Sequence, residues 1–277
     1  MEYSLLSRYD DLLADIFLDG LHLWFRTIKM NADHSERRLP SKQLINIIRN
    51  HIIGRNRVTD AAQECLNLDF FKDYLRGVSQ KDKSAFGQHM KRYLSMYVPN
   101  AGFEICDTRR YSQEGEEAQA CVIATKDWSI GDEIKMCSGM IAVLASEDDD
   151  ELKRQNRDFS VMFSTRKNCS CLFLGPARFM NHDCDSNCKF IPLGQAAITL
   201  KVVKDVKCGD ELTSFYGDQY FGEDNCECRC VTCERRGNGF FKPPEIEEEI
   251  VEEQQEVSAR RSTRKRKAVS YEGNIGL

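Results

Sequence analysis

Several features that would assign the chain to a common class of protein are missing from its sequence. The 277 residues contain no run approaching about eighteen consecutive apolar residues, so no membrane-spanning helix is expected. The N-terminus shows no basic start followed by an apolar stretch, so we expect no secretory signal. Histidine is scarce, and His22, His51 and His89 lack a second ligand type at metal spacing. We interpret these three as surface or packed side chains.

The distribution of cysteine and charge says more than either total. Thirteen cysteines is an odd number, and four of them fall between Cys226 and Cys233 while the others are dispersed. This pattern favours a reducing compartment and one metal site. The net charge of −5 conceals an acidic run at 245–256 that is followed by a basic run at 260–267. Local charge is therefore a better guide to partners than the sum.

The first 97 residues are predicted to form a helical domain. Apolar residues recur at spacings of three and four after Asp10, which would cap a helix whose apolar stripe extends to Trp24. Further helices are expected between Ser41 and Gly54 and after Ser79. Such stripes indicate a packed core.

From Val98 onward, short apolar runs with period two are punctuated by proline and glycine, which predicts strands. Two Gly-Asp-Glu sequences, beginning at Gly131 and Gly209, would form tight turns between strands. The acidic run 147–151 is expected to be a solvated loop or the start of a helix. The predicted fold class is therefore α+β, with helices first and a mostly-β domain after them.

A cysteine strip near residue 230 carries a chemical signal. Cys228, Cys230 and Cys233 form a CxCxxC pattern, which supplies three thiolates. Structural zinc takes four ligands in a tetrahedron, and the sequence after the strip contains no second CxxC or HxxxH pair. The strip therefore predicts a zinc site that is completed by a ligand from elsewhere in the chain.

The fourth ligand has several candidates. Cys184, which ends the sequence Asn-His-Asp-Cys at 181–184, is the best donor, and Cys188 and Cys226 are alternatives. Choosing Cys184 ties the C-terminal strip to the middle of the predicted β domain.

Taken together, these motifs resemble the SET-domain protein lysine methyltransferases. The Asn-His-x-Cys sequence, the sequence Gly-Asp-Glu-Leu-Thr-Ser-Phe-Tyr-Gly at 209–217 and the CxCxxC strip are similar to the two signature motifs and the post-SET segment of that family, in the same order. Residues 8–241 resemble one subgroup, which methylates lysine 20 of histone H4. The subgroup likeness is carried by residues 102–105, 110–112, 124–128, 158–169, 174–176 and 233–237.

The resemblance implies a fold that periodicity does not predict. The segments of Asn181 and Tyr216 would be brought together in a knot-like crossing. The crossing would leave a pocket for S-adenosylmethionine on one side and a lysine channel on the other, with one structural Zn²⁺ holding the channel wall. The implied domains are a SET domain over 98–222, a post-SET zinc segment over 223–244 and a disordered acidic, then basic, tail over 245–277.

The resemblance also implies roles for individual residues. Tyr216 is the expected catalytic residue, because its hydroxyl would orient the amine or the methyl group. The expected cofactor-binding residues are Tyr111, Ser112, Gln113, Glu114, Ala120, Arg166, Asn181 and His182. The expected walls of the lysine channel are Phe159, Ser160, Phe163, Phe215 and Phe221, with Ser160 as the candidate for control of the number of methyl groups. The expected zinc ligands are Cys184, Cys228, Cys230 and Cys233.

Three departures from the family pattern stand out. The region 115–120 has no Gly-x-Gly pair, Ser186 stands where proline is common, and Cys226 is an extra cysteine. The lysine-20 subgroup also lacks the Gly-x-Gly pair, so the first departure favours that subgroup.

The sequence thus predicts an S-adenosylmethionine-dependent enzyme that methylates lysine 20 of histone H4 in nucleosomes. A nuclear, chromosomal location is expected, and the basic run 260–267 would serve nuclear import or contact DNA. The alternatives are a zinc-stabilised, inactive chromatin-binding module and a methyltransferase for another histone lysine. The presence of Asn181, His182 and Tyr216 together favours an enzyme.

Overall fold

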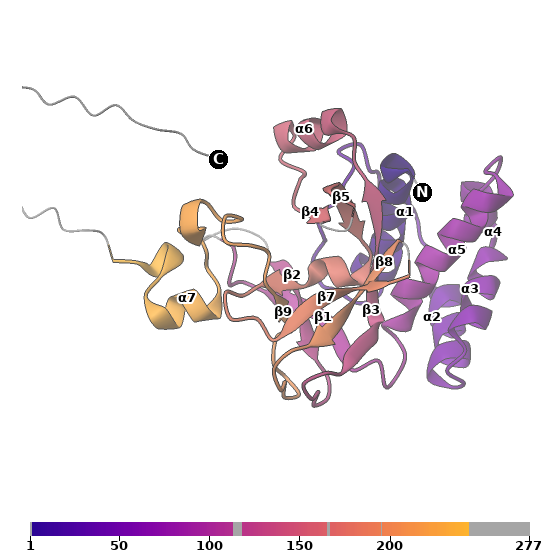
Figure 1. The fold of residues 1–277 in the computed structure, drawn as a ribbon. Coiled ribbons are helices and arrows are strands. Elements are labelled where there is room, and N and C mark those ends of the chain that lie inside the picture. The colour runs from indigo at the N-terminus through magenta and orange to yellow at the C-terminus, as the bar shows by residue number, and fades with distance from the viewer. Residues whose placement is uncertain (1, 113–117, 165–166, 195, 244–277) are drawn as a thin grey trace, which may run out of the picture. The chain divides into compact units, whose positions relative to one another are not determined.

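The computed structural model describes residues 2–112, 118–164, 167–194 and 196–243. The compact unit formed by the chain ends at Lys242. Its helices gather in the N-terminal part and its strands follow, which confirms the predicted fold class (Figure 1). Within the described ranges, we find no helix with the length and apolar character needed to cross a membrane. The predicted acidic and basic tail lies outside the described residues.

The helices before residue 97 pack against one another, with α5 in contact with α1 and α3. α1 runs directly into a π-helical segment, η1, and α2 likewise runs into η2. Their bounds are Tyr3–Ala14 (α1), Asp15–Asp19 (η1), Ser41–Ile47 (α2), Ile48–Ile53 (η2), Val58–Leu66 (α3), Asp69–Tyr74 (α4) and Gln80–Ser95 (α5). The later helical segments are Ser146–Arg154 (α6), Pro176–Phe179 (η3), Glu223–Asn225 (η4), Val231–Arg236 (α7) and Gly239–Phe241 (η5).

Local sequence signals predicted one of these helix boundaries correctly and two incorrectly. Ser79 caps α5, because its side chain accepts a hydrogen bond from the backbone N–H of Asp82 at 3.1 Å, as its position predicts. Asp10 was wrongly expected to cap a helix, since it lies fully buried inside α1. Trp24 was wrongly placed on the apolar stripe and is 67% exposed, because the helix ends five residues earlier at Asp19.

The strands form a curled sheet and a separate hairpin. The strands are Phe103–Thr108 (β1), Gln119–Ala124 (β2), Glu133–Val143 (β3), Val161–Ser164 (β4), Cys169–Leu174 (β5), Asn181–His182 (β6), Cys188–Leu193 (β7), Ala197–Val202 (β8) and Thr213–Ser214 (β9). β1 pairs with β2, and in the described residues the larger sheet has the order β4-β5-β3-β8-β7-β9-β6. The two apolar runs at 134–137 and 140–143 belong to one strand, β3, which has a register shift between Glu133 and Ser138.

A short parallel pairing positions the site. Asn181 pairs with Thr213 and His182 pairs with Ser214, although these pairs are about thirty residues apart in sequence. The Asn-His-x-Cys segment therefore lies beside the segment that leads into Tyr216, as the resemblance implies.

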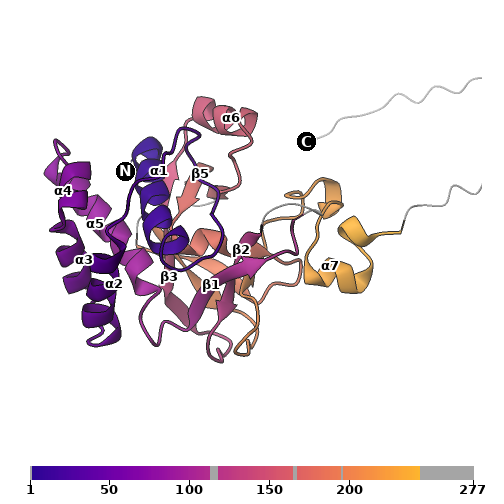
Figure 2. The ribbon, with the colours of Figure 1, turned by 180° about the vertical axis from the view of Figure 1, so that it is seen from behind.

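Buried hydrophobic clusters join the helices to the sheet, and one of them contains residues from both sides of residue 97. α1 contacts β3 and β5, and α5 contacts β3, on the side seen in Figure 2. Leu6 of α1 is fully buried in a cluster with Leu172 and Leu174 of β5. The predicted boundary at residue 97 stays a prediction about sequence organisation, because the core crosses it without interruption.

Candidate active site

Two cavities meet at a shared wall. The first has a volume of about 510 Å³ and the second about 560 Å³. Five residues line both of them, namely Phe159, Ser160, Arg178, Tyr216 and Tyr220. Both volumes fall within the range of small-molecule sites, roughly 300–1,000 Å³. The wall is therefore the place where a molecule in one cavity could meet a group inserted into the other.

Tyr216 belongs to this wall and follows one of the two paired motif strands. Its hydroxyl donates a hydrogen bond to the carbonyl oxygen of Met180, the residue that precedes Asn181. Burial raises the pKa of Tyr216, so the phenol keeps its proton and remains a donor. Its ring lies nearly parallel to that of Phe221, with centroids 6.4 Å apart.

Asn181 links three segments at the side of the first cavity. Its Nδ2 atom donates to the carbonyl oxygen of Ala120 at 3.1 Å and to Oε1 of Glu211 at 2.9 Å. Burial raises the pKa of Glu211, while the hydrogen bond from Asn181 opposes that shift by favouring the carboxylate. Asn181 thus holds β2 against the segment that leads to β9.

His182 contacts both the backbone of Tyr216 and the thiol of Cys184. Its Nδ1 atom accepts the backbone N–H of Tyr216 at 3.1 Å, and its Nε2 atom lies 3.2 Å from Sγ of Cys184. Burial lowers the pKa of His182, which favours the neutral ring. Because Nδ1 accepts, the one proton of the neutral ring resides on Nε2, which donates toward the sulfur.

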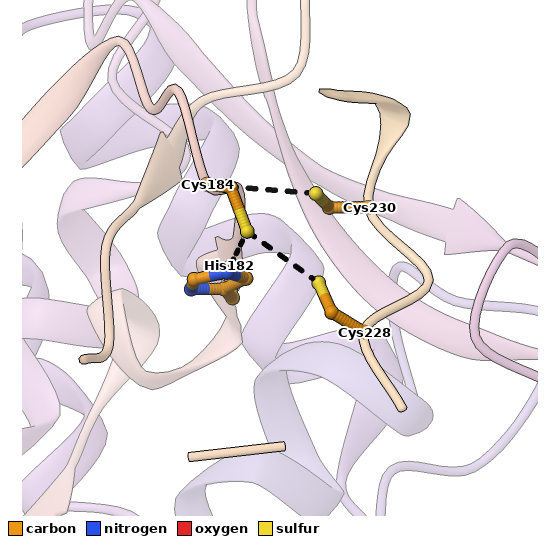
Figure 3. Close-up of side chains that lie close together, drawn as sticks. All are labelled: His182, Cys184, Cys228 and Cys230. Carbon is orange, nitrogen blue, oxygen red and sulfur yellow. Dashed lines mark hydrogen bonds between the residues drawn. The ribbon is translucent and has the colours of Figure 1, made fainter. Parts of the chain in front are cut away.

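Four cysteine sulfurs gather beside His182, three of them from the C-terminal strip. Sγ of Cys184 lies 3.9 Å from Sγ of Cys228 and 3.5 Å from Sγ of Cys233. Sγ of Cys230 accepts the backbone N–H of Cys184 at 3.4 Å and that of Cys233 at 3.3 Å. Figure 3 shows Cys184 facing Cys228 and Cys230 across the gap between the two segments, with His182 at its side.

The donor set fits a tetrahedral metal ion. Zinc–sulfur bonds of about 2.3 Å in a tetrahedron place sulfurs about 3.8 Å apart, and the two measured separations lie on either side of that value. His182, Cys184, Cys228 and Cys230 also lie within 4.8 Å of one another. His182 is nevertheless a poor ligand, since its Nε2 carries the proton. Cys233, whose sulfur lies 3.5 Å from that of Cys184, would complete a set of four sulfur donors, and an N–H···S bond from His182 would then orient Cys184.

The predicted cofactor residues divide into three groups. Tyr111, Ala120, Asn181 and His182 line the first cavity, and the Tyr111 hydroxyl donates to the His182 carbonyl oxygen at 3.4 Å. Ser112 follows Tyr111 and is placed outside the lining of both cavities where the structure describes them. Gln113, Glu114 and Arg166 lie outside the described residues.

The predicted channel residues separate between the cavities. Phe159 and Ser160 belong to the shared wall. Phe163 and Phe215 line the second cavity and are 60% and 43% exposed, so they lie at its mouth. The structure places Phe221 in the lining of the first cavity, against Tyr216.

Sequence reasoning missed part of the lining. Residues 25–28 line the first cavity, and Arg178 and Tyr220 line both. Arg178 precedes Asn181 by three residues, so its position next to the motif was a usable signal. Residues 25–28 lie over 150 residues from the motif, and no sequence signal links them to it, because their contacts are made only in the folded chain.

Comparisons with known proteins agree with this geometry. The family model for the SET domain matches residues 119–217. Histone-lysine N-methyltransferase set9 of Schizosaccharomyces pombe is 40% identical over 239 residues, which are 85% of this chain and 54% of the relative. Histone-lysine N-methyltransferase SET9 of Phaeosphaeria nodorum is 35% identical over 259 residues, which are 92% of this chain and 39% of the relative.

A relative of more similar length is Histone-lysine N-methyltransferase Suv4-20 of Caenorhabditis elegans. It is 36% identical over 237 residues, which are 85% of this chain and 81% of the relative. The chain thus spans about half or less of the two fungal relatives and most of the nematode one. Because the paired motif strands, the cysteine cluster and these similarities coincide, the chain belongs to the SET-domain family of histone-lysine N-methyltransferases.

Proposed function

We propose that the chain is an S-adenosylmethionine-dependent methyltransferase that modifies lysine 20 of histone H4 in nucleosomes. The observation that carries the proposal is the wall shared by the two cavities, with Tyr216 in it. A methyl transfer needs a donor and an acceptor held in line from opposite sides, and two cavities that meet at one tyrosine supply that arrangement.

The first cavity suits the cofactor. Its volume of about 510 Å³ is that of a small-molecule site, and its lining combines aromatic rings with convergent polar side chains from Tyr111, Asn181 and His182. When bound, S-adenosylmethionine supplies a methyl group on a positively charged sulfur. Its aromatic neighbours Tyr216 and Phe221 would present ring faces that favour positive charge.

The second cavity suits a lysine side chain. Its walls are mostly aromatic and apolar, with Phe163 and Phe215 at the mouth and Phe159 at the shared wall. A lysine has a pKa of about 10.4 in water, and an apolar channel disfavours the ammonium form. The chain can therefore receive the amine without a dedicated base, while the Tyr216 hydroxyl and the Met180 carbonyl mark the point where the amine is oriented.

We further propose that Cys184, Cys228, Cys230 and Cys233 hold one structural Zn²⁺. The distances between their sulfur atoms support the proposal. Phe221 and Asn225 lie shortly before the three cysteines of the strip in the sequence. Asn225 donates from Nδ2 to the Gly217 carbonyl oxygen at 2.8 Å, one residue after Tyr216. A metal at the cysteines would thus hold the segment that follows the catalytic tyrosine.

The choice of lysine 20 of histone H4 is supported by the subgroup likeness of the sequence and by the similarity to Suv4-20. The test is a methylation assay with labelled S-adenosylmethionine and nucleosomes that carry either wild-type H4 or H4 with arginine at position 20, followed by site-resolved mass spectrometry. Label confined to the wild-type H4 tail at lysine 20 is the expected result. Label at another histone lysine would reject the site, and no label from a zinc-loaded protein would reject the enzyme.

A nuclear and chromosomal location follows from this proposal. We infer that the basic run at 260–267 contributes to nuclear import or to DNA contact. Deleting these residues should lower the nuclear fraction of the protein or weaken its binding to nucleosomes. If neither quantity changes, the basic run has no part in either process.

A further inference from the structure

An extended segment of the N-terminal region forms part of the first cavity. We call residues 25–31 the strap. Phe25 and Thr27 are 8% and 7% exposed, whereas Ile28 and Trp24, which directly precedes the strap, are 62% and 67% exposed, so buried and exposed positions alternate here. The strap's residues 25–28 line the cavity together with Asn181 and Tyr216. It lies outside the matched SET region at 119–217.

Carboxylates of α1 and η1 hold the strap at several points. Asp11, Asp15 and Asp19 recur every four residues, so they lie on one face of the helix. Asp11 accepts the backbone N–H of Met30 at 2.7 Å and that of Asn31 at 2.9 Å.

The other two carboxylates hold the strap nearer the cavity. Asp19 accepts the backbone N–H of Thr27 at 3.2 Å and its hydroxyl at 3.0 Å, and it pairs with Lys29. Asp15 pairs with Arg26 at 3.1 Å. The hydrogen bonds and ion pairs of Asp15 and Asp19 are therefore made with residues that line the cavity or directly follow its lining.

Asp11, Asp15 and Asp19 interact mainly with residues of the strap. The side chains of Asp15 and Asp19 are 4% and 0% exposed, and Asp11 is fully buried. Burying a carboxylate is costly unless it accepts hydrogen bonds or pairs with a cation. Most of the hydrogen-bond and ion-pair partners of these three carboxylates belong to the strap, so this face of the helix fixes the strap in place.

A second clamp joins the strap to the shared wall. Nη2 of Arg178 donates to the carbonyl oxygen of Ile28 at 3.0 Å, and Nε lies 3.3 Å from Oδ2 of Asp10. Oδ1 of Asp10 accepts the Tyr93 hydroxyl at 2.6 Å and lies 2.9 Å from Nε2 of His89. The guanidinium, which belongs to both cavities, is thus held by a buried carboxylate of α1.

We propose that the strap is a wall of the cofactor-binding site, and that Asp11 and Asp19 are positioning residues for S-adenosylmethionine binding. The proposal rests on the proposed function. It assigns part of the cofactor site to the N-terminal helices, so these helices set cofactor affinity as well as stability. A substitution that loosens the strap should weaken cofactor binding much more than it slows the transfer step at saturating cofactor.

Hydrogen exchange on the unaltered protein gives the first test. Adding S-adenosylmethionine or S-adenosylhomocysteine should slow amide exchange at residues 25–28, as it should in the Asn181 segment. The amides of α4 serve as the internal reference, because none of its residues lines the first cavity. Slower exchange at Asn181 with no change at residues 25–28 would overturn the proposal.

Asp19→Asn gives the second test. The amide keeps one acceptor for Thr27 but sets an N–H₂ against the Lys29 ammonium, so the strap should loosen. We expect the Kd and the KM for S-adenosylmethionine to rise about tenfold, with kcat and the KM for an H4 peptide changed less than about twofold. The matched control is Asp69→Asn, whose carboxylate is 97% exposed and should leave all four constants unchanged.

The outcomes separate this proposal from the proposed function. If Asp19→Asn does not fold, Thr27→Val removes the two hydrogen bonds of the hydroxyl, to Asp19 and from Lys29, and should still raise the Kd by about threefold. Equal loss of kcat and cofactor affinity, or unchanged affinity in a folded variant, overturns the role of the strap. Absence of methylation by the unaltered protein overturns the proposed function, whereas cofactor binding and exchange at the strap can still be measured.

Discussion

The backbone N–H of Tyr216 donates to Nδ1 of His182 at 3.1 Å, and this contact joins the wall shared by the two cavities to the cysteine cluster. The other ring nitrogen of His182 lies 3.2 Å from Sγ of Cys184. A single imidazole thus connects the segment of the proposed catalytic residue with a proposed zinc ligand. Disturbance of the metal site should therefore reach Tyr216 through one side chain.

Removing the hydroxyl of Tyr216 should abolish most of the activity. In Tyr216→Phe, the ring can keep its packing against Phe221 while the hydrogen bond to the Met180 carbonyl oxygen is lost. We expect a fall in kcat of about 100-fold or more, because an orienting group in the transition state is removed. The Kd for S-adenosylmethionine, measured by calorimetry, should change little.

Tyr220→Phe is the control for that change. Tyr220 shares the same wall but is 43% exposed, and its loss of a hydroxyl should cost less than about fivefold in kcat. Equal loss in the two variants would remove Tyr216 from its special role.

Cys184→Ser should lower zinc content and activity together. The substitution removes one of the four proposed ligands and the acceptor of the His182 N–H. Metal analysis of the purified protein should give well under one zinc per chain, and the melting temperature should fall. Asn181→Ala should keep its zinc while losing cofactor affinity, since Asn181 holds Ala120 and Glu211.

Cys226→Ser is the matched control for the zinc measurement. Cys226 belongs to the same strip, yet it is exposed and its sulfur is 4.0 Å from the Phe221 carbonyl oxygen. Zinc content should stay at one per chain. Loss of zinc in this variant would mean that the ligand set has been assigned incorrectly.

Glu211 predicts a pH dependence of stability. Burial raises its pKa above 4.5, so the unfolded chain loses this proton at a lower pH than the folded chain. The free energy of unfolding therefore falls as the pH rises from the unfolded pKa through the folded pKa. Glu211→Gln removes this loss and can still accept from Asn181. Urea unfolding should show a larger gain in stability at pH 7 than at pH 4, and an equal gain at both would contradict the assignment.

Ser160→Phe should reduce the number of methyl groups added. Ser160 is 8% exposed and lines both cavities, so a phenyl ring there would fill space that a methylated amine needs. Mass spectrometry of H4 should show a shift toward fewer methyl groups. Ser164→Phe, at the end of strand β4, which begins directly after Ser160, is the comparison. An unchanged product ratio in Ser160→Phe would exclude this residue from that role.

Leu6→Ala should destabilise the whole unit. Leu6 is fully buried between α1 and the sheet, in contact with the cluster of Leu172 and Leu174. We expect a loss of about 2–5 kcal/mol in one cooperative transition, as is usual for such cavities. Leu193→Ala, at a site 41% exposed, should cost less than about 1 kcal/mol. Two separate transitions in either protein would show that the helices and the sheet unfold independently.

The sequence alone was sufficient to predict the fold class, the family and several side chains that gather around the site. The family was predicted from the order and spacing of three motifs, at 181–184, 209–217 and 228–233. These motifs contain Asn181, His182, Cys184 and Tyr216. Local chemistry was also reliable where it acts over one turn, as at the Ser79 cap. It failed at Asp10 and Trp24, where a tertiary ion pair and the end of η1 outweighed the apolar period.

Only the tertiary structure decided how the site is completed. The pairing of β6 with β9 brings the Tyr216 segment beside His182. Nδ1 of His182 accepts the Tyr216 N–H, and its Nε2 atom faces the Cys184 sulfur. The strap could not be predicted, since Asp11 and Asp19 show their purpose only when residues 27–31 fold back onto α1 and η1. Hydrogen bonds between segments depend on distance in space, and a single sequence records only distance along the chain.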